Sequence, residues 1–348
     1  MSPLEEIITL GHEEIVFRQD PASGYRAIIA LHSTALGPAT GGTRLWSYDS
    51  FDDALLDALR LSRGMTYKNA IAGLALGGGK AVILAPPEPF DREQIFLAHG
   101  RAVQSLGGRF ITAEDVGTSP ADFEIAARET TWVAGIDGRG GDPTPWTARG
   151  VMAGLVAATE HRWGSPALEG RVVALQGCGN VGAALAHQLA DAGATLVVTD
   201  RESARAERLA SDLGASVVDP EAIYDVEADI FSPCALGSIL NDATIGRLRA
   251  EVIAGAANNQ LAESRHAEAL SARDIVYAPD FVINSGGVIS GSVALLNETH
   301  DDMVRRVDGI YDTTREVLDH AARERITTLR AAEMRAELTL ANARRDDR

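Results

Sequence analysis

The stretch VVALQGCGNVGAALAHQLADAGATLVVTD, residues 172–200, constrains the fold more than any other part of the chain. Gly177, Gly179 and Gly182 follow an apolar β-like run and open a helix-like segment, and Asp200 ends the next β-like run. A lone G-x-G-x-x-G pattern is weak in a chain with 34 glycines, but a strand before it, a helix after it and an acid eighteen residues further on make the signal specific. The pattern predicts a Rossmann unit that binds a dinucleotide.

Each residue of this motif has its own physical role. Gly177 permits the tight turn, Gly179 lets a pyrophosphate approach the backbone, and Gly182 lets helix and strand pack closely. Asp200 would accept hydrogen bonds from the ribose hydroxyls and repel a 2′-phosphate, which favours NAD over NADP. Arg201 could instead pair with that phosphate, so NADP stays open, as does a turn of this kind without any nucleotide.

The rest of the chain divides into two parts around the segment GIDGRGGDPTP, residues 135–145, which is dense in Gly and Pro. Beyond it, helical segments alternate with the apolar runs RVVALQG, TLVVTD, ASVVD, ADIFSP, EVIAGA and DIVYAP, a pattern typical of a parallel sheet. Before it, the β-like runs EEIVFR, YRAIIALH, KAVILA and RFITAE mix with helices, the clearest of which follows Ser50. We expect an α/β protein with an N-terminal domain at 1–143, a Rossmann domain at 147–324, and a C-terminal helix at 325–348 that returns to the first domain.

Two lysines in MTYKNAIAGLALGGGKAVI indicate a second site. Lys68 lies near a helix end and Lys80 opens a strand, and we expect the glycines at 77–79 to form a turn that folds one lysine toward the other. Crowding would lower one pKa, so that one lysine could bind a carboxylate while the other acts as a base. Asp115 falls at the end of a strand, a usual location for catalytic groups in α/β folds. Alone, a lysine is more often a solvated surface group, and an acid beside a strand end is more often a cap or a salt-bridge partner.

Composition excludes several classes of function. A net charge of −17 disfavours nucleic acid and anionic membranes as partners. Cys178 and Cys234 have neither the spacing of a disulfide framework nor that of a metal site, and Cys178 is expected to be a small packing residue. The eight histidines form no metal-binding motif. The N-terminus lacks the pattern of a signal peptide. We expect a cytoplasmic protein with no metal.

The motifs GGTRLWSY, DALRLSRGMTYKNAIAGLALGGGKAVI, RFITAEDVGT, QGCGNVG, DIFSPCALG, AGAANNQL and APDFVINSGGVI together resemble the glutamate/leucine/phenylalanine/valine family of amino-acid dehydrogenases. The similarity runs from about residue 10 to 335, and within the family it is greatest to the leucine enzymes, with the phenylalanine and tryptophan enzymes next. It implies a substrate and assembly domain, an NAD domain and a cleft between them. It also implies a homo-oligomer that converts an L-amino acid reversibly to its 2-oxo acid and ammonia.

The resemblance assigns roles by position. Lys80 would activate water for attack on the imine left by hydride transfer, Asp115 would shuttle protons to and from the amino group, and Lys68 would bind the α-carboxylate. Further substrate contacts are implied for Gly41, Gly42, Met65, Thr40, Ala113, Asn259, Asn284, Val288 and Gly291. Cofactor contacts are implied for Thr147, Gly177, Cys178, Gly179, Asn180, Val181, Gly182, Asp200, Arg201, Cys234, Ala235, Asn259 and Asn284.

Three positions depart from the pattern of the leucine enzymes. Thr40 and Gly291 stand where apolar, branched residues are usual, and Ser285 stands where alanine is usual. A larger pocket with an extra hydroxyl suggests a substrate bulkier or more polar than leucine, although Gly291 could instead let a neighbouring helix approach. The substrate could therefore be an aliphatic, an aromatic or a specialised amino acid. The chain could also be a biosynthetic reductive aminase or a non-catalytic NAD-binding protein. The direction of reaction and the number of subunits stay open too.

Overall fold

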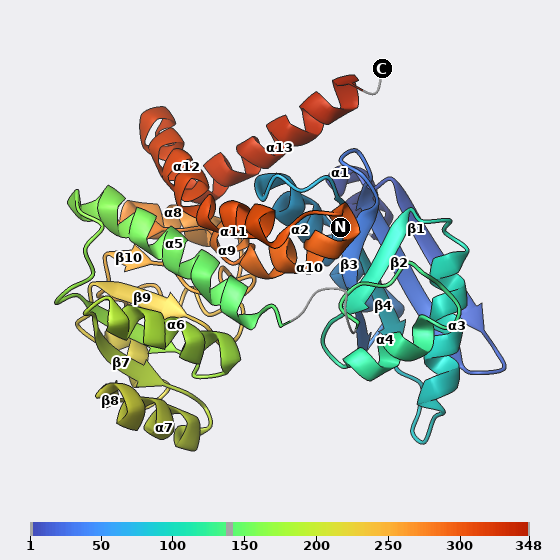
Figure 1. The fold of residues 1–348 in the computed structure, drawn as a ribbon, viewed down its shortest axis with the longest axis horizontal. Coiled ribbons are helices and arrows are strands. Elements are labelled where there is room, and N and C mark those ends of the chain that lie inside the picture. The colour runs from blue at the N-terminus through green and yellow to red at the C-terminus, as the bar shows by residue number, and fades with distance from the viewer. Residues whose placement is uncertain (1–2, 137–141, 347–348) are drawn as a thin grey trace. The chain divides into compact units, whose positions relative to one another are not determined.

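The computed structural model describes residues 3–136 and 142–346, which form two compact units (Figure 1). The first unit comprises the described residues of 1–141, 291–298 and 336–348, and the second comprises 142–290 and 299–335. Within the Gly- and Pro-rich segment at 135–145, residues 137–141 lie outside the described residues, and helix α5 begins at Thr144. The last helix, α13 (Thr328–Asp346), contributes residues to both units, with the change at Ala336.

The first unit is built on a mixed sheet with strand order β1-β2-β4-β3-β5. β1 is antiparallel to β2 and β2 to β4, whereas β3 runs parallel to both β4 and β5. The strands are β1 (Glu14–Asp20), β2 (Tyr25–Ser33), β3 (Ala39–Trp46), β4 (Gly77–Leu84) and β5 (Phe110–Glu114). The helices before residue 137 are α1 (Pro3–Leu10), α2 (Phe51–Ile71), α3 (Arg92–Gln104) and α4 (Pro120–Ala126).

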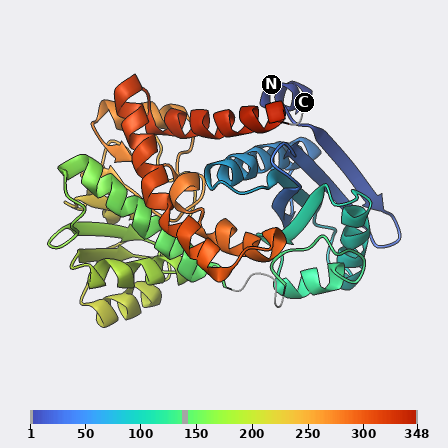
Figure 2. The same cartoon turned by 45° about the horizontal axis from the view of Figure 1, so that its top comes forward.

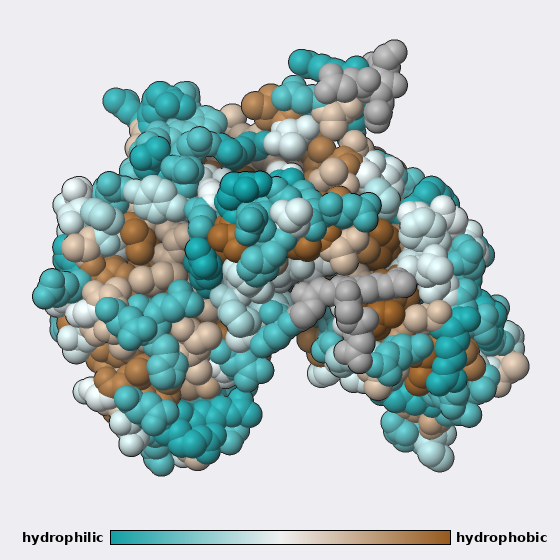
Figure 3. All heavy atoms as spheres, in the orientation of Figure 1, coloured by the Kyte–Doolittle hydropathy of each residue, from teal (hydrophilic) through white to brown (hydrophobic). Residues whose placement is uncertain are grey.

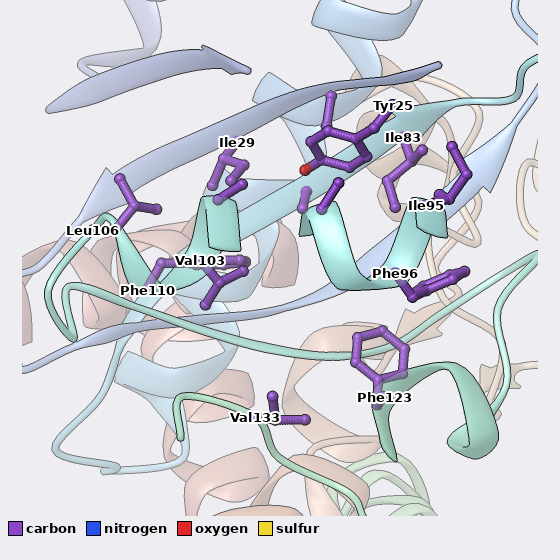
Figure 4. Close-up of a cluster of buried hydrophobic side chains, with 14 of the residues drawn as sticks. Tyr25, Ile29, Ile83, Ile95, Phe96, Val103, Leu106, Phe110, Phe123 and Val133 are labelled. Atoms are coloured by element: carbon purple, nitrogen blue, oxygen red, sulfur yellow. The ribbon is translucent and has the colours of Figure 1, made fainter. Parts of the chain in front are cut away.

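Helices cover both faces of this sheet. On one face, buried apolar residues of α2 such as Leu55 and Leu59 pack with Ile28 and Val82 of the sheet. On the other face, α3 and α4 bury a larger hydrophobic cluster, shown in Figure 4 with Tyr25, Ile29, Ile83, Ile95, Phe96, Val103, Leu106, Phe110, Phe123 and Val133 labelled. Helix α2 begins where the sequence predicts, because the Ser50 side chain accepts the backbone N–H of Asp53.

The second unit holds a six-stranded parallel sheet with the order β11-β10-β9-β6-β7-β8. The chain builds outward from β6 in one direction and then in the other, which is the Rossmann order. The strands are β6 (Val172–Gln176), β7 (Thr195–Thr199), β8 (Ser216–Val217), β9 (Ile230–Pro233), β10 (Val252–Ile253) and β11 (Val276–Tyr277). The short 3₁₀ helix η1 spans Ala222–Asp225.

Helices fill most of the second half of the chain. α12 packs along α5 in both cartoon views (Figures 1 and 2). The α-helices after residue 142, apart from α13, are α5 (Thr144–Trp163), α6 (Asn180–Asp191), α7 (Ser203–Leu213), α8 (Arg265–Ala272), α9 (Asp280–Ile283), α10 (Gly286–Leu296), α11 (His300–Asp308) and α12 (Ile310–Glu324). No described helix is both long and apolar enough to cross a membrane, and hydrophilic side chains cover much of the face in Figure 3.

The fold class predicted from the sequence is confirmed, but the prediction of a turn at the glycines 77–79 is wrong. Gly77, Gly78 and Gly79 are the first three residues of β4 and are buried, and Lys80 is the fourth. A Cβ atom at Gly78 would lie 2.0 Å from the backbone nitrogen of Thr66 in α2. Gly78 therefore lets a helix lie directly on the strand, and the three glycines begin the strand rather than bending the chain.

The sequence pattern also does not predict strand β3. Its residues, ATGGTRLW, include two glycines, which have low strand propensity. The strand forms because β4 and β5 pair with it on both sides. It is the central piece of the region described below, so this omission matters for the site.

We predict that Gly78→Ala lowers the free energy of unfolding by about 2 kcal/mol, because the added methyl group overlaps the backbone of α2. Urea unfolding measures the change. The control is Gly64→Ala in the same helix, where an added Cβ meets no atom within 4 Å. That control should gain roughly 0.5–1 kcal/mol from helix propensity. Equal stability of the two variants would contradict the close contact.

Candidate functional site

Three parallel strands of the first unit present a row of residues toward α2. In the register, Thr40 pairs with Gly78 and Gly42 pairs with Ala113. Residues paired across parallel strands share a face, and alternate residues of one strand share it too. The face covered by α2 therefore carries Thr40, Gly42 and Arg44 of β3, Gly78 and Lys80 of β4, and Ala113 of β5 with Asp115 just beyond it.

The centre of this face is an ion pair between Lys80 and Asp115. The Lys80 ammonium donates a hydrogen bond to Asp115 Oδ2, and only 6% of Lys80 is exposed. Burial lowers the pKa of Lys80, Asp115 opposes that lowering, and the nearby Arg44 adds to it. Burial would raise the pKa of Asp115, but Lys80 and Arg44 outweigh it and hold this pKa below its usual range. The pair thus joins an ionised carboxylate to an amine that releases its proton more readily than a surface lysine.

Asp115 is held by a turn at the end of β5. Its backbone N–H donates to Thr118 Oγ1 over 3.0 Å, and the Thr118 hydroxyl lies 3.1 Å from the carbonyl oxygen of Thr43. The adjacent Glu114 is exposed, and burial together with the charges of Asp122 and Asp115 raises its pKa. The turn directs one carboxylate into the site and leaves its neighbour outside.

A buried polar cluster fixes β3 against β5 on the opposite face of the sheet. His99 Nε2 lies 3.1 Å from both Thr43 Oγ1 and Thr112 Oγ1, and these two hydroxyls are 2.6 Å apart. The other ring nitrogen, Nδ1, lies 3.0 Å from the Tyr25 hydroxyl. Burial lowers the pKa of His99 to about 3, so the ring is neutral at physiological pH. The cluster sets the spacing between the strands that carry Gly42 and Asp115.

Helix α2 adds the residues expected to bind a carboxylate. Lys68 and Met65 are half-buried on this helix, three residues apart. Their neighbour Asn69 is fully buried and donates to Thr40 Oγ1 over 3.0 Å and to the carbonyl oxygen of Gly77 over 2.6 Å. The Thr40 hydroxyl, which is the extra hydroxyl noted in the sequence, accepts this hydrogen bond from Asn69.

The sequence does not single out four residues of this site, which are Asn69 on α2 and the group of Arg44, Asp57 and Tyr48. Arg44 Nη1 lies 2.7 Å from Asp57 Oδ2, and Arg44 Nε lies 3.4 Å from Asp115 Oδ2. The Tyr48 hydroxyl donates to the same Asp57 oxygen over 2.5 Å. Recognising β3 as a strand would have found Arg44, because it lies two residues after Gly42 and so on the same face.

The glycine loop of the second unit lies between β6 and α6, as predicted. Gly177 has φ +101°, and a Cβ there would come within 2.8 Å of the Ala235 backbone. A Cβ at Gly182 would lie 2.0 Å from the carbonyl oxygen of Gly177, whereas at Gly179 it would meet no atom within 4 Å. The loop is therefore tight at both ends and open in its middle, where α6 begins with Asn180 and Val181. This arrangement fits a pyrophosphate at a helix N-terminus.

Asp200 follows β7 and braces this loop. Its Oδ2 accepts the backbone N–H of Cys178 over 2.7 Å, and its Oδ1 accepts that of Glu202 over 2.9 Å. Each carboxylate oxygen has a second lone pair that a ribose hydroxyl could use. Arg201 beside it is exposed. Burial raises the pKa of the Cys178 thiol to about 12, which agrees with a packing role.

A second polar group of this unit gathers around Asn284. Its Nδ2 donates to Asn258 Oδ1 over 2.9 Å and to the Ala256 carbonyl oxygen over 3.1 Å. Its Oδ1 is buried and has no hydrogen-bond partner among the described residues, so it could accept from a carboxamide. Thr147 lies close to Gly287, because a Cβ at Gly287 would be 2.5 Å from Thr147 Oγ1.

The remaining expected residues are placed as follows. Asn259 is exposed with φ +50°, and its carbonyl oxygen accepts from Ser238. Cys234 and Ala235 follow β9, beside the glycine loop. Val288 and Gly291 lie in α10, and a Cβ at Gly291 would meet no atom of the described residues within 4 Å. No three His, Cys, Asp or Glu side chains of the described residues are grouped as a metal site.

Comparisons with known proteins show which families and structures this chain is similar to. A family model described as Glu/Leu/Phe/Val dehydrogenase, dimerisation domain, matches residues 12–132, and one described as Glutamate/Leucine/Phenylalanine/Valine dehydrogenase matches residues 198–347. The chain is 51% identical over 332 residues to leucine dehydrogenase from Geobacillus stearothermophilus, covering 94% of this chain and 90% of that one. It is 47% identical over 340 residues to valine dehydrogenase from Streptomyces coelicolor, covering 96% and 93%. The crystal structure of L-tryptophan dehydrogenase from Nostoc punctiforme superposes with a TM-score of 0.88 at 43% identity, covering 98% of this chain and 99% of that one.

We predict that Asp115→Asn lowers the free energy of unfolding by about 3 kcal/mol at pH 7, because Lys80 loses its buried counter-charge. Since the native state already disfavours the Lys80 ammonium, it binds fewer protons than the unfolded chain, and stability rises with pH. Without Asp115 the pKa of Lys80 in the native state falls further. The loss of unfolding free energy in Asp115→Asn should therefore become smaller as the pH rises toward 10. Urea unfolding at both pH values measures it.

The control for this prediction is Asp312→Asn, which removes an exposed carboxylate paired with Arg315. That variant should change stability little and equally at both pH values. A deficit in Asp115→Asn that stays constant between pH 7 and pH 10 would contradict the charge coupling.

Proposed function

The chain belongs to the Glu/Leu/Phe/Val family of amino-acid dehydrogenases, and from this premise we propose that it deaminates a hydrophobic L-amino acid oxidatively and reversibly, with NAD as oxidant. The products are the 2-oxo acid and ammonia. The observation that carries the proposal is the buried pair of Lys80 and Asp115, next to a helix that presents Lys68. This set contains a base, a proton carrier and a cation for a carboxylate.

The protein's residues divide the chemistry between them. Lys68 binds the α-carboxylate as a charged group, assisted by the backbone of Gly41 and Gly42. Lys80, whose pKa is lowered by burial, is neutral in a larger fraction of molecules and takes a proton from water as the water oxygen adds to the imine carbon. Asp115 carries protons to and from the amino nitrogen, so that ammonia can leave. NAD, when bound, supplies the hydride acceptor.

The two units have separate tasks in this proposal. We infer that the first unit, together with the end of α13, binds the amino acid and associates with further copies of the chain, because residues 12–132 match a dimerisation-domain model. The second unit binds NAD through the loop at 177–182, with Asp200 at the adenosine ribose and Asn284 and Thr147 at the carboxamide. Two free cysteines fit a cytoplasmic location.

For the substrate we favour branched-chain and related aliphatic amino acids, in keeping with the leucine and valine dehydrogenases at about half identity. Gly291 leaves space that a larger side chain could enter, and the Thr40–Asn69 pair adds a polar point. The L-tryptophan dehydrogenase likeness makes an aromatic substrate the second candidate. Pocket contacts worth roughly 1–3 kcal/mol decide between such side chains.

A substrate panel tests the function directly. Purified protein is mixed with NAD or NADP and leucine, valine, isoleucine, phenylalanine, tryptophan or a polar analogue at alkaline pH, and absorbance at 340 nm is followed. We expect NADH from the aliphatic amino acids and a much lower rate with NADP. Reduction by no member of a broad panel would instead support a non-catalytic binding protein. Activity with only one non-standard amino acid would support a biosynthetic reductive aminase.

Removing each lysine in turn separates their roles. We predict that Lys80→Ala lowers kcat by about 10²–10⁴ while NAD affinity stays within a few fold, since Lys80 belongs to the other unit from the glycine loop. Lys68→Ser, the matched variant, should mainly raise KM for the amino acid. Steady-state kinetics and NAD titration measure both. Unimpaired turnover in Lys80→Ala, or an unchanged KM in Lys68→Ser, would refute the respective assignment.

A further inference from the structure

We propose that Arg44 is a positioning residue that aligns Asp115 with Lys80 by bridging Asp115 to Asp57 on helix α2. The proposal rests on the proposed function, because it concerns the same Lys80–Asp115 pair. It adds a third charged group to the reacting centre, one that contacts the proton carrier rather than the substrate.

The geometry places one carboxylate oxygen between two cations. Asp115 Oδ2 accepts from Lys80 and lies 3.4 Å from Arg44 Nε. The Arg44 Nε is buried and makes no hydrogen bond with any described residue, so its contact with Asp115 is an ion pair rather than a hydrogen bond. The other edge of the guanidinium is fixed, since Nη1 lies 2.7 Å from Asp57 Oδ2. Tyr48 donates to that same Asp57 oxygen and fixes it in turn.

An arginine is suited to this position for two reasons. The planar guanidinium can engage carboxylates on two edges at once, whereas a lysine offers one compact charge. A guanidinium also stays protonated, so Arg44 cannot take the proton that Lys80 and Asp115 exchange. The whole sequence follows this division, because only two of its 32 basic residues are lysines, Lys68 and Lys80.

The electrostatic setting agrees with a positioning role. Burial would lower the pKa of Arg44, but the charges of Asp115 and Asp57 outweigh burial and raise this pKa above its usual value. Arg44 in turn helps to keep Asp115 ionised and helps to lower the pKa of Lys80. The other charged or titratable groups that act on these residues are Asp57 of α2, Tyr48 after β3 and Glu114 of β5, and Lys68 lies further along α2.

Arg44 also lines a pocket beside the turn that carries Asp115. A pocket of about 390 Å³ opens in the first unit and is lined by Arg44, Tyr48, Asp57 and Val116, among others. The Arg44 side chain is only 23% exposed there, and Val116 directly follows Asp115. Shortening the side chain at position 44 would admit water toward Asp115, which would weaken the attraction between Asp115 and Lys80.

The alternative is that Arg44 merely braces β3 against α2. A brace and a positioning residue both affect stability, but only the positioning residue changes the protonation of Lys80. Removal of the Arg44 charge should raise the pKa of Asp115 and also that of Lys80, so both effects act in the same direction. The ascending limb of the kcat/KM profile, where Lys80 becomes neutral, should therefore move to higher pH.

The test compares Arg44→Gln and Arg44→Lys with the control Arg171→Gln. Arg171 has a similar environment, because it pairs with Asp229 at 2.9 Å with 29% of its side chain exposed and lies over the Trp163 ring. It belongs to the second unit and precedes β6, at the other end of that strand from the glycine loop. Two readouts are recorded against pH: kcat/KM, and trace acetylation of Lys80 by acetic anhydride, followed by peptide mass spectrometry. The presence of only two lysines makes this labelling unambiguous.

We expect Arg44→Gln to lower kcat/KM at pH 8 by roughly tenfold to a hundredfold through misplacement of Asp115, and to move both pH curves upward. Arg44→Lys should return the curves toward those of the unaltered protein without restoring the full rate. If Arg44→Gln does not fold, a kcat/KM of Arg44→Lys at pH 8 equal to that of the unaltered protein overturns the proposal. Arg171→Gln should leave both curves in place. Curves of both Arg44 variants that superimpose on those of the unaltered protein would overturn the proposal.

The labelling arm keeps this test independent of the proposed function. If none of the amino acids in the panel allows the unaltered protein to reduce NAD, the proposed function fails. The acetylation curve of Lys80 still reports whether Arg44 controls its protonation. An upward shift of that curve in Arg44→Gln supports the electrostatic positioning, and its absence overturns it.

Discussion

The attraction between Lys80 and Asp115 is the interaction on which the site depends. Both groups lie on the α2 face of a sheet, and Lys80 is almost completely buried. A buried ammonium without a counter-charge would be strongly unfavourable. An ammonium stabilised too strongly by its carboxylate partner would not release its proton. Burial and the second cation at Arg44 counteract the carboxylate, so the amine is held near its partner and still loses its proton more readily than a free lysine.

Small residues in the strands make this arrangement possible. A Cβ at Gly41 would lie 1.8 Å from the carbonyl oxygen of Gly79, and a Cβ at Gly42 would lie 2.8 Å from the Cβ of Asp115. Together with Gly78 under α2, these positions let backbone approach backbone where most strands carry side chains. The consequence is a sheet surface on which Lys80 and Asp115 can meet, bordered by Lys68 and Asn69 of the helix.

The distribution of basic residues follows the same logic. Arginine serves nearly everywhere a cation is needed for structure, as in the pairs Arg162–Glu251 and Arg171–Asp229. Lysine occurs only at positions 68 and 80. Since a guanidinium does not give up its proton in proteins, a reaction that needs a neutral amine cannot use arginine. In the proposed mechanism Lys80 and Arg44, neighbours on one sheet face, serve different purposes.

The sequence by itself determined the Rossmann unit, because the glycine spacing, the flanking apolar runs and Asp200 are local features that a strand-loop-helix unit requires. It also determined that Lys80 and Asp115 stand in or just beyond strands, and the family likeness supplied their expected roles. Only the tertiary structure decided that β3 is a strand, that the glycines at 77–79 serve packing rather than a turn, and that Arg44 joins the pair. Those outcomes depend on register and on contacts between residues far apart in the chain, such as Gly78 with Thr66 and Arg44 with Asp57. Local patterns carry no information about which distant surface a strand will meet.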